Sequence, residues 1–141
     1  MYVPSLDTAS IYFANEAHVK QEDKREWLGS TSVLAANESA TASIKAIEAE
    51  TGKIRWEAQL DHGPGINHFV GGVLSTAGGV VFAGYNDEFF AFDSDTGRNL
   101  WRVRVGARVN APPVAYAVGR TQFIALMAGN SLFAFSLPPA R

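Results

Sequence analysis

Residues 46–56 read AIEAETGKIRW, and residues 91–101 read AFDSDTGRNLW. Both stretches contain an apolar strand, an acidic residue, a Thr-Gly turn, a basic residue and a closing tryptophan, and Trp56 and Trp101 are 45 residues apart. A fainter third copy starts at residues 133–136, where FAFS echoes the FAFD of residues 90–93. A repeat with this period indicates a chain built from copies of one small structural unit.

The repeated turn has a physical explanation. Asp93 and Asp95 can accept hydrogen bonds from nearby backbone amides, and Gly97 can adopt a positive φ without a Cβ clash. The tryptophan four residues after the glycine offers a large flat surface, which we expect to pack between neighbouring units. The pairs Glu48/Glu50 and Asp93/Asp95 recur at one repeat position, so turn capping explains them better than paired catalytic carboxylates.

Composition excludes several classes of function. The chain has 141 residues, of which 47% are hydrophobic and 18% charged, which suits one ordinary soluble domain. Its formal net charge of −2 gives no electrostatic reason to expect binding to nucleic acid or anionic membranes. Cysteine is absent, and no apolar run is long enough to span a membrane. The first residues do not resemble a signal peptide, so the targeting segment of an exported parent is expected outside this chain.

Residues 61–105 are predicted to form one complete blade of a β-propeller. Glycine-rich and Asn-Asp or Ser-Asp-Thr-Gly turns separate four β-prone runs within about one repeat period. The predicted strands are residues 72–76, 80–84, 88–92 and 100–105. The pairs at residues 71–72 and 78–79 are interpreted as strand-end turns.

The two flanking blades are predicted to be incomplete. Residues 1–60 hold an isolated strand at residues 1–5, an insertion at residues 6–42 and the last two strands of a blade, whereas residues 106–141 supply three strands. The expected strands are residues 44–49 and 54–60 in the first blade, and 110–118, 122–128 and 132–137 in the last. The fold class is therefore all-β, a partial propeller of about three four-stranded antiparallel blades. Three blades cannot close a ring, so we favour a fragment of a larger propeller over self-association of copies.

The insertion at residues 6–42 breaks the repeat. Inserted loops of this length usually cover a site, mediate contacts or are disordered. The mixed-charge run at residues 20–26 is interpreted as a solvated segment. Tyr12, Phe13 and Trp27 are expected to anchor the loop rather than bind a ligand.

No residue is assigned a catalytic or metal-binding role from the pattern alone. His62 and His68 flank a Gly-Pro-Gly loop, and their spacing matches no standard zinc pattern. These two residues and His18 are interpreted as ordinary loop histidines. No Ser-His-Asp arrangement or phosphate-binding glycine loop stands out.

The Thr-Gly turns resemble the tryptophan-docking repeats of pyrroloquinoline quinone (PQQ) propellers. Residues 71–84, GGVLSTAGGVVFAG, look like a segment in the C-terminal part of quinoprotein alcohol dehydrogenases of the methanol and ethanol type. Residues 2–4, YVP, resemble the strand that precedes a long loop on the active-site side of those enzymes. The likeness runs over essentially the whole chain and is most specific from residue 43 onward.

The resemblance implies an eight-bladed periplasmic enzyme of which this chain is the C-terminal third. Such enzymes hold PQQ and a calcium or lanthanide ion near the propeller axis, a catalytic aspartate acts as base on a small alcohol, and hydride passes to the quinone. The metal ligands and that aspartate occur upstream of the part matched here. The chain alone is therefore expected to be inactive, with the remaining blades of the parent as its partners.

The resemblance also implies one local contact with the cofactor, at Phe69, Val70 and Gly71. The family often has tryptophan or asparagine just before the glycine pair, whereas this chain has Phe69 and Val70 preceded by Asn67 and His68. Val70 has no side-chain donor, so only a backbone amide there could hydrogen-bond a quinone oxygen. The Trp-Gly-Gly near the last strand of the family is replaced by Gly-Asn-Ser at residues 129–131.

Two alternatives remain open at the level of sequence. The chain could belong to a non-catalytic propeller that binds protein partners, similar to the outer-membrane assembly lipoproteins, and the Phe69-Val70 departure favours that hypothesis. It could also be a small stand-alone protein that completes a ring by self-association.

Overall fold

A computed structural model describes residues 1–7, 10–14, 30–34, 41–60 and 70–137, and all of its regular elements are strands. The described part contains no helix suited to crossing a membrane. The strands are β1 (Tyr2–Asp7), β2 (Ser10–Ala14), β3 (Ser30–Leu34), β4 (Thr41–Ile47), β5 (Ile54–Leu60), β6 (Val70–Ser75), β7 (Val80–Tyr85), β8 (Glu88–Asp93), β9 (Asn99–Arg104), β10 (Val114–Val118), β11 (Thr121–Ala128) and β12 (Ser131–Ser136).

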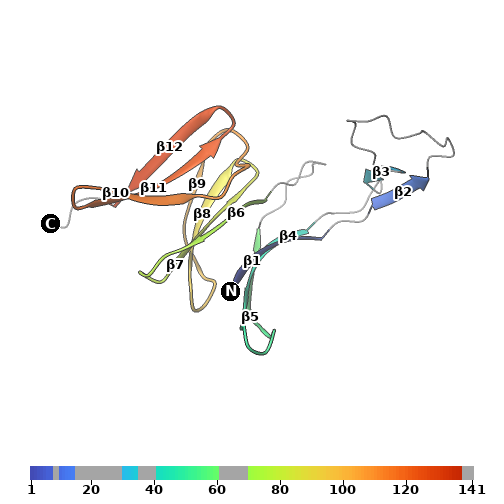
Figure 1. The fold of residues 1–141 in the computed structure, drawn as a ribbon, viewed down its shortest axis with the longest axis horizontal. Coiled ribbons are helices and arrows are strands. Elements are labelled where there is room, and N and C mark those ends of the chain that lie inside the picture. The colour runs from blue at the N-terminus through green and yellow to red at the C-terminus, as the bar shows by residue number, and fades with distance from the viewer. Residues whose placement is uncertain (8–9, 15–29, 35–40, 61–69, 138–141) are drawn as a thin grey trace, which may run out of the picture.

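Three antiparallel sheets make up the body of the molecule. We call β1-β4-β5 sheet 1, β6-β7-β8-β9 sheet 2 and β10-β11-β12 sheet 3. Figure 1 shows sheet 2 between the other two. The sheets do not close into a ring, so the prediction of an all-β partial propeller is confirmed.

Sheet 2 is covered on both faces because its strands are apolar on both sides. Phe90 and Phe92 of β8 belong to the core shared with sheet 1, whereas Phe89 belongs to the core shared with sheet 3. Successive strand residues point to opposite faces, so this run of aromatic residues supplies both cores. All three rings are at most 3% exposed.

The first docking contact joins sheet 1 to the turn between β8 and β9. Trp56 is 8% exposed and its Nε1 donates a hydrogen bond to the carbonyl of Ser94 at 2.9 Å. Its indole covers Gly97, where an added Cβ would lie 2.6 Å from Trp56 Cε3. The Tyr2 hydroxyl donates to the same Ser94 carbonyl at 3.1 Å. The expected packing of the repeat tryptophan between neighbouring units is therefore confirmed at Trp56.

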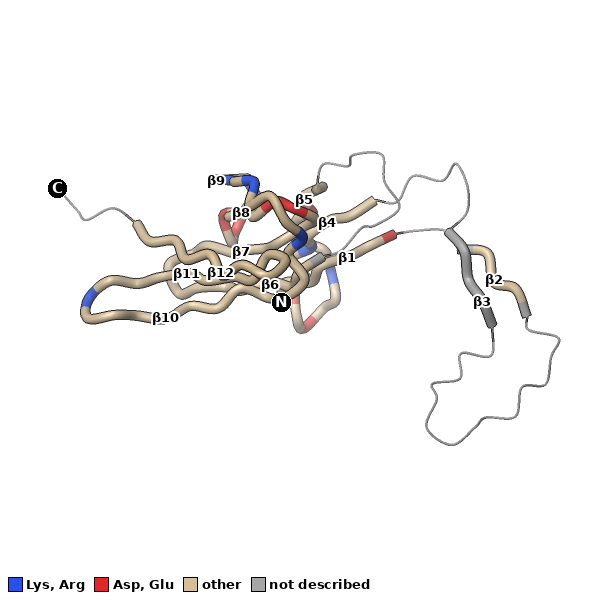
Figure 2. The backbone as a smooth tube through the Cα atoms, turned by 90° about the horizontal axis from the view of Figure 1, so that it is seen from above, with Lys and Arg blue, Asp and Glu red and all other residues tan. Residues whose placement is uncertain are grey.

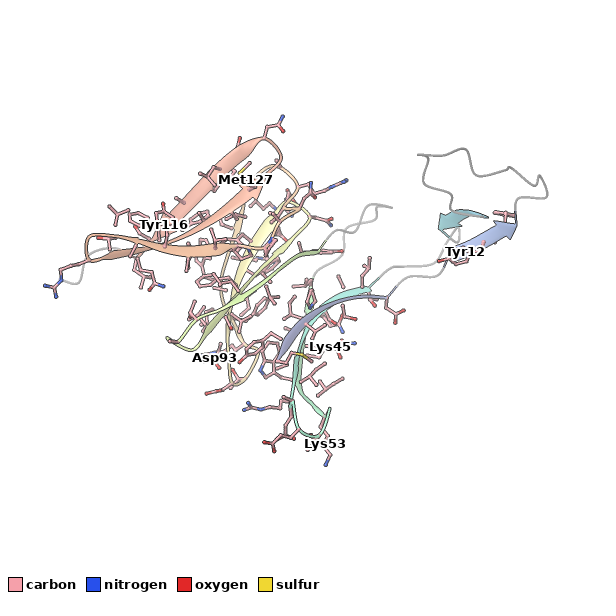
Figure 3. The ribbon with its side chains drawn as sticks, viewed as in Figure 1. Tyr12, Lys45, Lys53, Asp93, Tyr116 and Met127 are labelled. Carbon is pink, nitrogen blue, oxygen red and sulfur yellow. The ribbon has the colours of Figure 1, made fainter. Side chains whose placement is uncertain are left out.

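The turn itself is held by the side chain of Asp93, which is labelled in Figure 3. Asp93 Oδ1 accepts hydrogen bonds from the amides of Asp95 and Thr96 and from the Thr96 hydroxyl, at 3.1, 2.9 and 2.8 Å. Gly97 has a φ of +72°. The prediction that these acidic residues serve the turn is confirmed at Asp93.

This turn should make stability depend on pH. Hydrogen bonds from the Thr96 hydroxyl and then the Thr96 amide hold the pKa of Asp93 below its ordinary value of 3.8. A depressed folded-state pKa contributes stability that is present above the unfolded value and is lost as the pH falls through the folded value. We expect urea titrations to show this loss below pH 3.8, and to show a smaller loss in Asp93→Asn. An unchanged pH profile in that variant would contradict the assignment.

Four sequence predictions differ from the structure. The insertion contains an antiparallel hairpin, β2-β3, that was not predicted. Tyr12 and Phe13 are 72% and 53% exposed, so the prediction that they anchor the loop is wrong, while Trp27 lies outside the described residues. The last sheet starts at Val114 rather than at residue 110, because residues 112–113 are prolines and lack backbone donors.

The fourth difference concerns the first glycine pair. Residues 71–72 lie inside β6 at an irregularity in its pairing with β7, not at a strand-end turn. Gly72 has a φ of +74°, which explains the glycine at this bulge. The second pair, at residues 78–79, does form the turn between β6 and β7.

Candidate functional site

The described strand ends from which the longer connections leave lie at one end of the sheets. Tyr2 and Trp56 donate hydrogen bonds to the Ser94 carbonyl at the opposite end. These bonds fix how sheet 1 is aligned along sheet 2. The insertion leaves sheet 1 between Asp7 and Thr41, which pair with each other opposite the docked end. The connection at residues 61–69, which is not described, joins that end of sheet 1 to the start of β6. We call this the loop end.

The predicted cofactor residues map to the loop end of sheet 2. Phe69 lies outside the described residues, as do Asn67 and the three histidines. Val70 starts β6 and pairs with Tyr85, next to the two-residue turn that leads into β8. Gly71 is buried in β6 directly after it.

Gly71 has a packing role that the sequence did not reveal. A Cβ on Gly71 would lie 2.8 Å from Val109 Cγ1 and 2.9 Å from the Val109 carbonyl oxygen. Gly84 lies under the same valine, with its Cβ position inside the Val109 side chain. Val109 is 0% exposed and its amide donates to the Asn86 carbonyl at 2.7 Å. The connection between sheets 2 and 3 is thus inserted into a hollow made by two glycines.

Polar groups lie at the same end of sheet 2, on the face opposite this hollow. Glu88 starts β8 with a side chain only 12% exposed, and its Oε1 accepts a hydrogen bond from Arg104 Nε at 3.3 Å. Burial raises the pKa of the neighbouring Tyr85 above its ordinary value of 10. The ion pair between Glu88 and Arg104 was not predicted from the sequence. The available signal was a glutamate just after a turn, with an arginine on the facing strand.

The repeat and the sheets agree with a family of known proteins. Residues 40–137 match the sequence model of the PQQ_2 family, described as outer membrane protein assembly factor BamB. The chain belongs to the PQQ-repeat family. The matched residues include β4 and β5 of sheet 1 and all strands of sheets 2 and 3.

Curated relatives of this PQQ-repeat chain include quinoprotein alcohol dehydrogenases. It is 30% identical to quinoprotein alcohol dehydrogenase PedE of Pseudomonas putida over 129 residues, which cover 91% of this chain and 20% of that protein. It is 32% identical over 140 residues to quinohemoprotein alcohol dehydrogenase ADH-IIG of Pseudomonas putida, covering 92% of this chain and 19% of that protein. The chain spans about a fifth of the length of these relatives.

Solved structures show the same fold. The quinohemoprotein alcohol dehydrogenase ADHIIG from Pseudomonas putida matches 93% of this chain and 20% of its own at a TM-score of 0.75 and 26% identity. BamB from Moraxella catarrhalis matches 68% of this chain and 33% of its own at a TM-score of 0.50 and 16% identity, a likeness of fold alone.

The described residues do not by themselves form a site for PQQ or a metal. Within them, no group of three or more acidic or histidine side chains is placed to hold a metal ion. Every buried side-chain polar atom in the described part already has a hydrogen-bond partner, so none of them needs one from a cofactor. The Cβ direction of Gly71 is filled by Val109, not by open space. We therefore derive no reaction step from these residues.

Proposed function

We propose that this chain is part of a PQQ-dependent alcohol dehydrogenase, to which it contributes propeller blades and part of the wall of the cofactor pocket. The observation that carries the proposal is the match to quinoprotein alcohol dehydrogenases over more than nine-tenths of the chain, at 30% and 32% identity. The match in fold to a quinohemoprotein alcohol dehydrogenase supports it.

In this proposal, residues 1–60 form an incomplete blade interrupted by the insertion at residues 6–42. Residues 61–105 form a complete blade, and residues 106–141 form a further incomplete blade. The loop end of sheet 2 then faces the cofactor, with Phe69, Val70 and Gly71 in the wall. Within this wall, Gly71 packs against the Val109 connection.

The chemistry is assigned to the remaining blades of the parent protein. Residues of those blades would hold PQQ and a calcium or lanthanide ion and would include the aspartate that acts as base. Bound PQQ would supply the hydride acceptor for a small alcohol. The parent would work in the periplasm.

A second candidate is a non-catalytic propeller that binds protein partners. The description of the matching family model, outer membrane protein assembly factor BamB, favours it. The relatives matched over most of the chain favour the enzyme instead.

The test is reconstitution of the full-length parent protein with PQQ and Ca²⁺ or a lanthanide, followed by dye-linked oxidation of short alcohols. We expect turnover by the reconstituted parent and none by this chain alone under the same conditions. Turnover by the chain alone would contradict the assignment of the chemistry to the remaining blades. If the parent shows no turnover and retains no PQQ after dialysis, the result would favour the non-catalytic propeller that binds protein partners.

A further inference from the structure

The hairpin in the insertion stands apart from the three sheets. Its strands β2 and β3 pair with each other, and among the described residues neither strand makes an extended contact with sheet 1, 2 or 3. Figures 1 and 2, which are perpendicular views, both show the hairpin beyond the loop end of sheet 1. A two-stranded hairpin alone is at best marginally stable in water, so this one needs a surface to pack on.

The side chains at the centre of β2 are large, apolar and exposed. Ile11 is 49% exposed, and Tyr12 and Phe13 are more exposed still. None of the three belongs to either core of the described residues. Figure 3 labels Tyr12 on this strand, and β2 contains no charged residue. Exposed apolar surface that is contiguous in this way is typical of a contact site.

The two faces of the hairpin differ in chemistry. Successive strand residues point to opposite faces, so Ile11 and Phe13 share one face and Tyr12 lies on the other. The register pairs Ile11 with Val33, whereas Tyr12 is paired with Ser32. A tyrosine hydroxyl can hydrogen-bond water, but the side chains of Ile11 and Phe13 have no polar atom and are stabilised by leaving water. The Ile11–Phe13 face is therefore the one suited to docking.

The tether of the hairpin restricts where it can dock. Only residues 8 and 9 separate the end of β1 at Asp7 from the start of β2 at Ser10. Three steps between consecutive Cα atoms span at most about 11 Å, so β2 starts close to the loop end of sheet 1. The chain spans about a fifth of the length of its curated relatives, so in the proposed parent further blades adjoin this end.

We propose that the Ile11–Phe13 face of the β2–β3 hairpin docks on an apolar surface of the parent polypeptide outside residues 1–141, beside the loop end of sheet 1. The hairpin then joins this part of the chain to another blade, while Tyr12 stays in contact with water. The identity of the occupant rests on the proposed function, in which most of the parent lies outside this chain. The docking itself requires neither cofactor nor turnover.

A second copy of the chain is the competing occupant. It would have to offer an apolar surface that stays exposed in the parent. The exposed apolar face of sheet 3, which includes Val114, Tyr116 and Val118, lies on the outer side of the partial propeller. Neighbouring blades of the proposed parent would cover this face, so it is not free to receive the hairpin of another copy.

Cysteine labelling tests the docking, because the chain has no cysteine of its own. The variants are Phe13→Cys and, as the matched control one residue away on the opposite face, Tyr12→Cys. In the chain alone, we expect both thiols to react with a maleimide at similar rates. In the parent, Phe13→Cys should react about tenfold more slowly than Tyr12→Cys, because burial of the Ile11–Phe13 face shields it. The rates are read by mass spectrometry of the hairpin peptide, and equal rates in the parent would overturn the proposal.

Photo-cross-linking identifies the occupant, with Phe13 of the parent replaced by p-benzoylphenylalanine. We expect a cross-link within one polypeptide, to a peptide outside residues 1–141. A cross-link to a second polypeptide would show a second copy, and a cross-link to residues 1–141 would show docking within the chain; either would overturn the proposal. The expected cross-link in a parent that binds no PQQ would remove the enzymatic proposal and leave the docked hairpin standing.

Discussion

Gly97→Ala should lower the free energy of unfolding by about 2–5 kcal/mol. A residue with a side chain at a φ of +72° costs about 1–2 kcal/mol relative to glycine. The new Cβ would also lie 2.6 Å from Trp56 Cε3, and overpacking of this kind costs about 1–3 kcal/mol. The loss is measured by urea unfolding followed by tryptophan fluorescence.

Gly52→Ala is the control for this prediction. It imposes the same strain, at a φ of +71°, but its Cβ meets no atom within 4 Å. The expected loss is therefore only the backbone part, about 1–2 kcal/mol. The difference between the two variants isolates the contact with Trp56, and equal losses would mean that this contact contributes nothing to stability.

Gly84→Ala should lower the free energy of unfolding by about 2–3 kcal/mol, near the upper end of measured overpacking costs. Its Cβ would overlap the side chain of Val109, which is fully buried between sheets 2 and 3. Gly84 is not among the residues with positive φ, so backbone strain adds nothing here.

A double-mutant cycle with Val109→Ala tests this explanation. Val109→Ala removes the Cγ1 atom that the new methyl group would meet, so the double variant should lose less stability than the sum of the single variants. Contacting residues typically show a coupling of about 0.5–3 kcal/mol. Additive losses would show that Gly84 is required for a reason other than the valine above it.

Much of the fold could be predicted from the sequence because its signals are local. The Thr-Gly turn, the acidic residue before it and the tryptophan after it lie within eleven residues in each repeat. The strands of sheet 2 are separated by short turns with glycine or asparagine, so their order and antiparallel pairing followed from adjacent segments. The family resemblance rested on these same local patterns.

The features that were missed depend on contacts between distant residues. Val109 is 25 residues from Gly84 and 38 from Gly71, and nothing next to either glycine indicates what covers it. The cofactor contact at Phe69, Val70 and Gly71 stays a prediction, and only the packing of Gly71 has a physical explanation in the described residues.

The shared acceptor at Ser94 has a consequence for how the molecule folds. The Tyr2 hydroxyl and the Trp56 indole reach it across 92 and 38 residues of chain. Contacts between such distant segments form slowly because a long loop must close first. During synthesis, β1 cannot form its hydrogen bond to Ser94 until the β8–β9 turn has been made. We therefore expect sheet 1 to reach its final position late in translation, with its apolar face bound by chaperones until then.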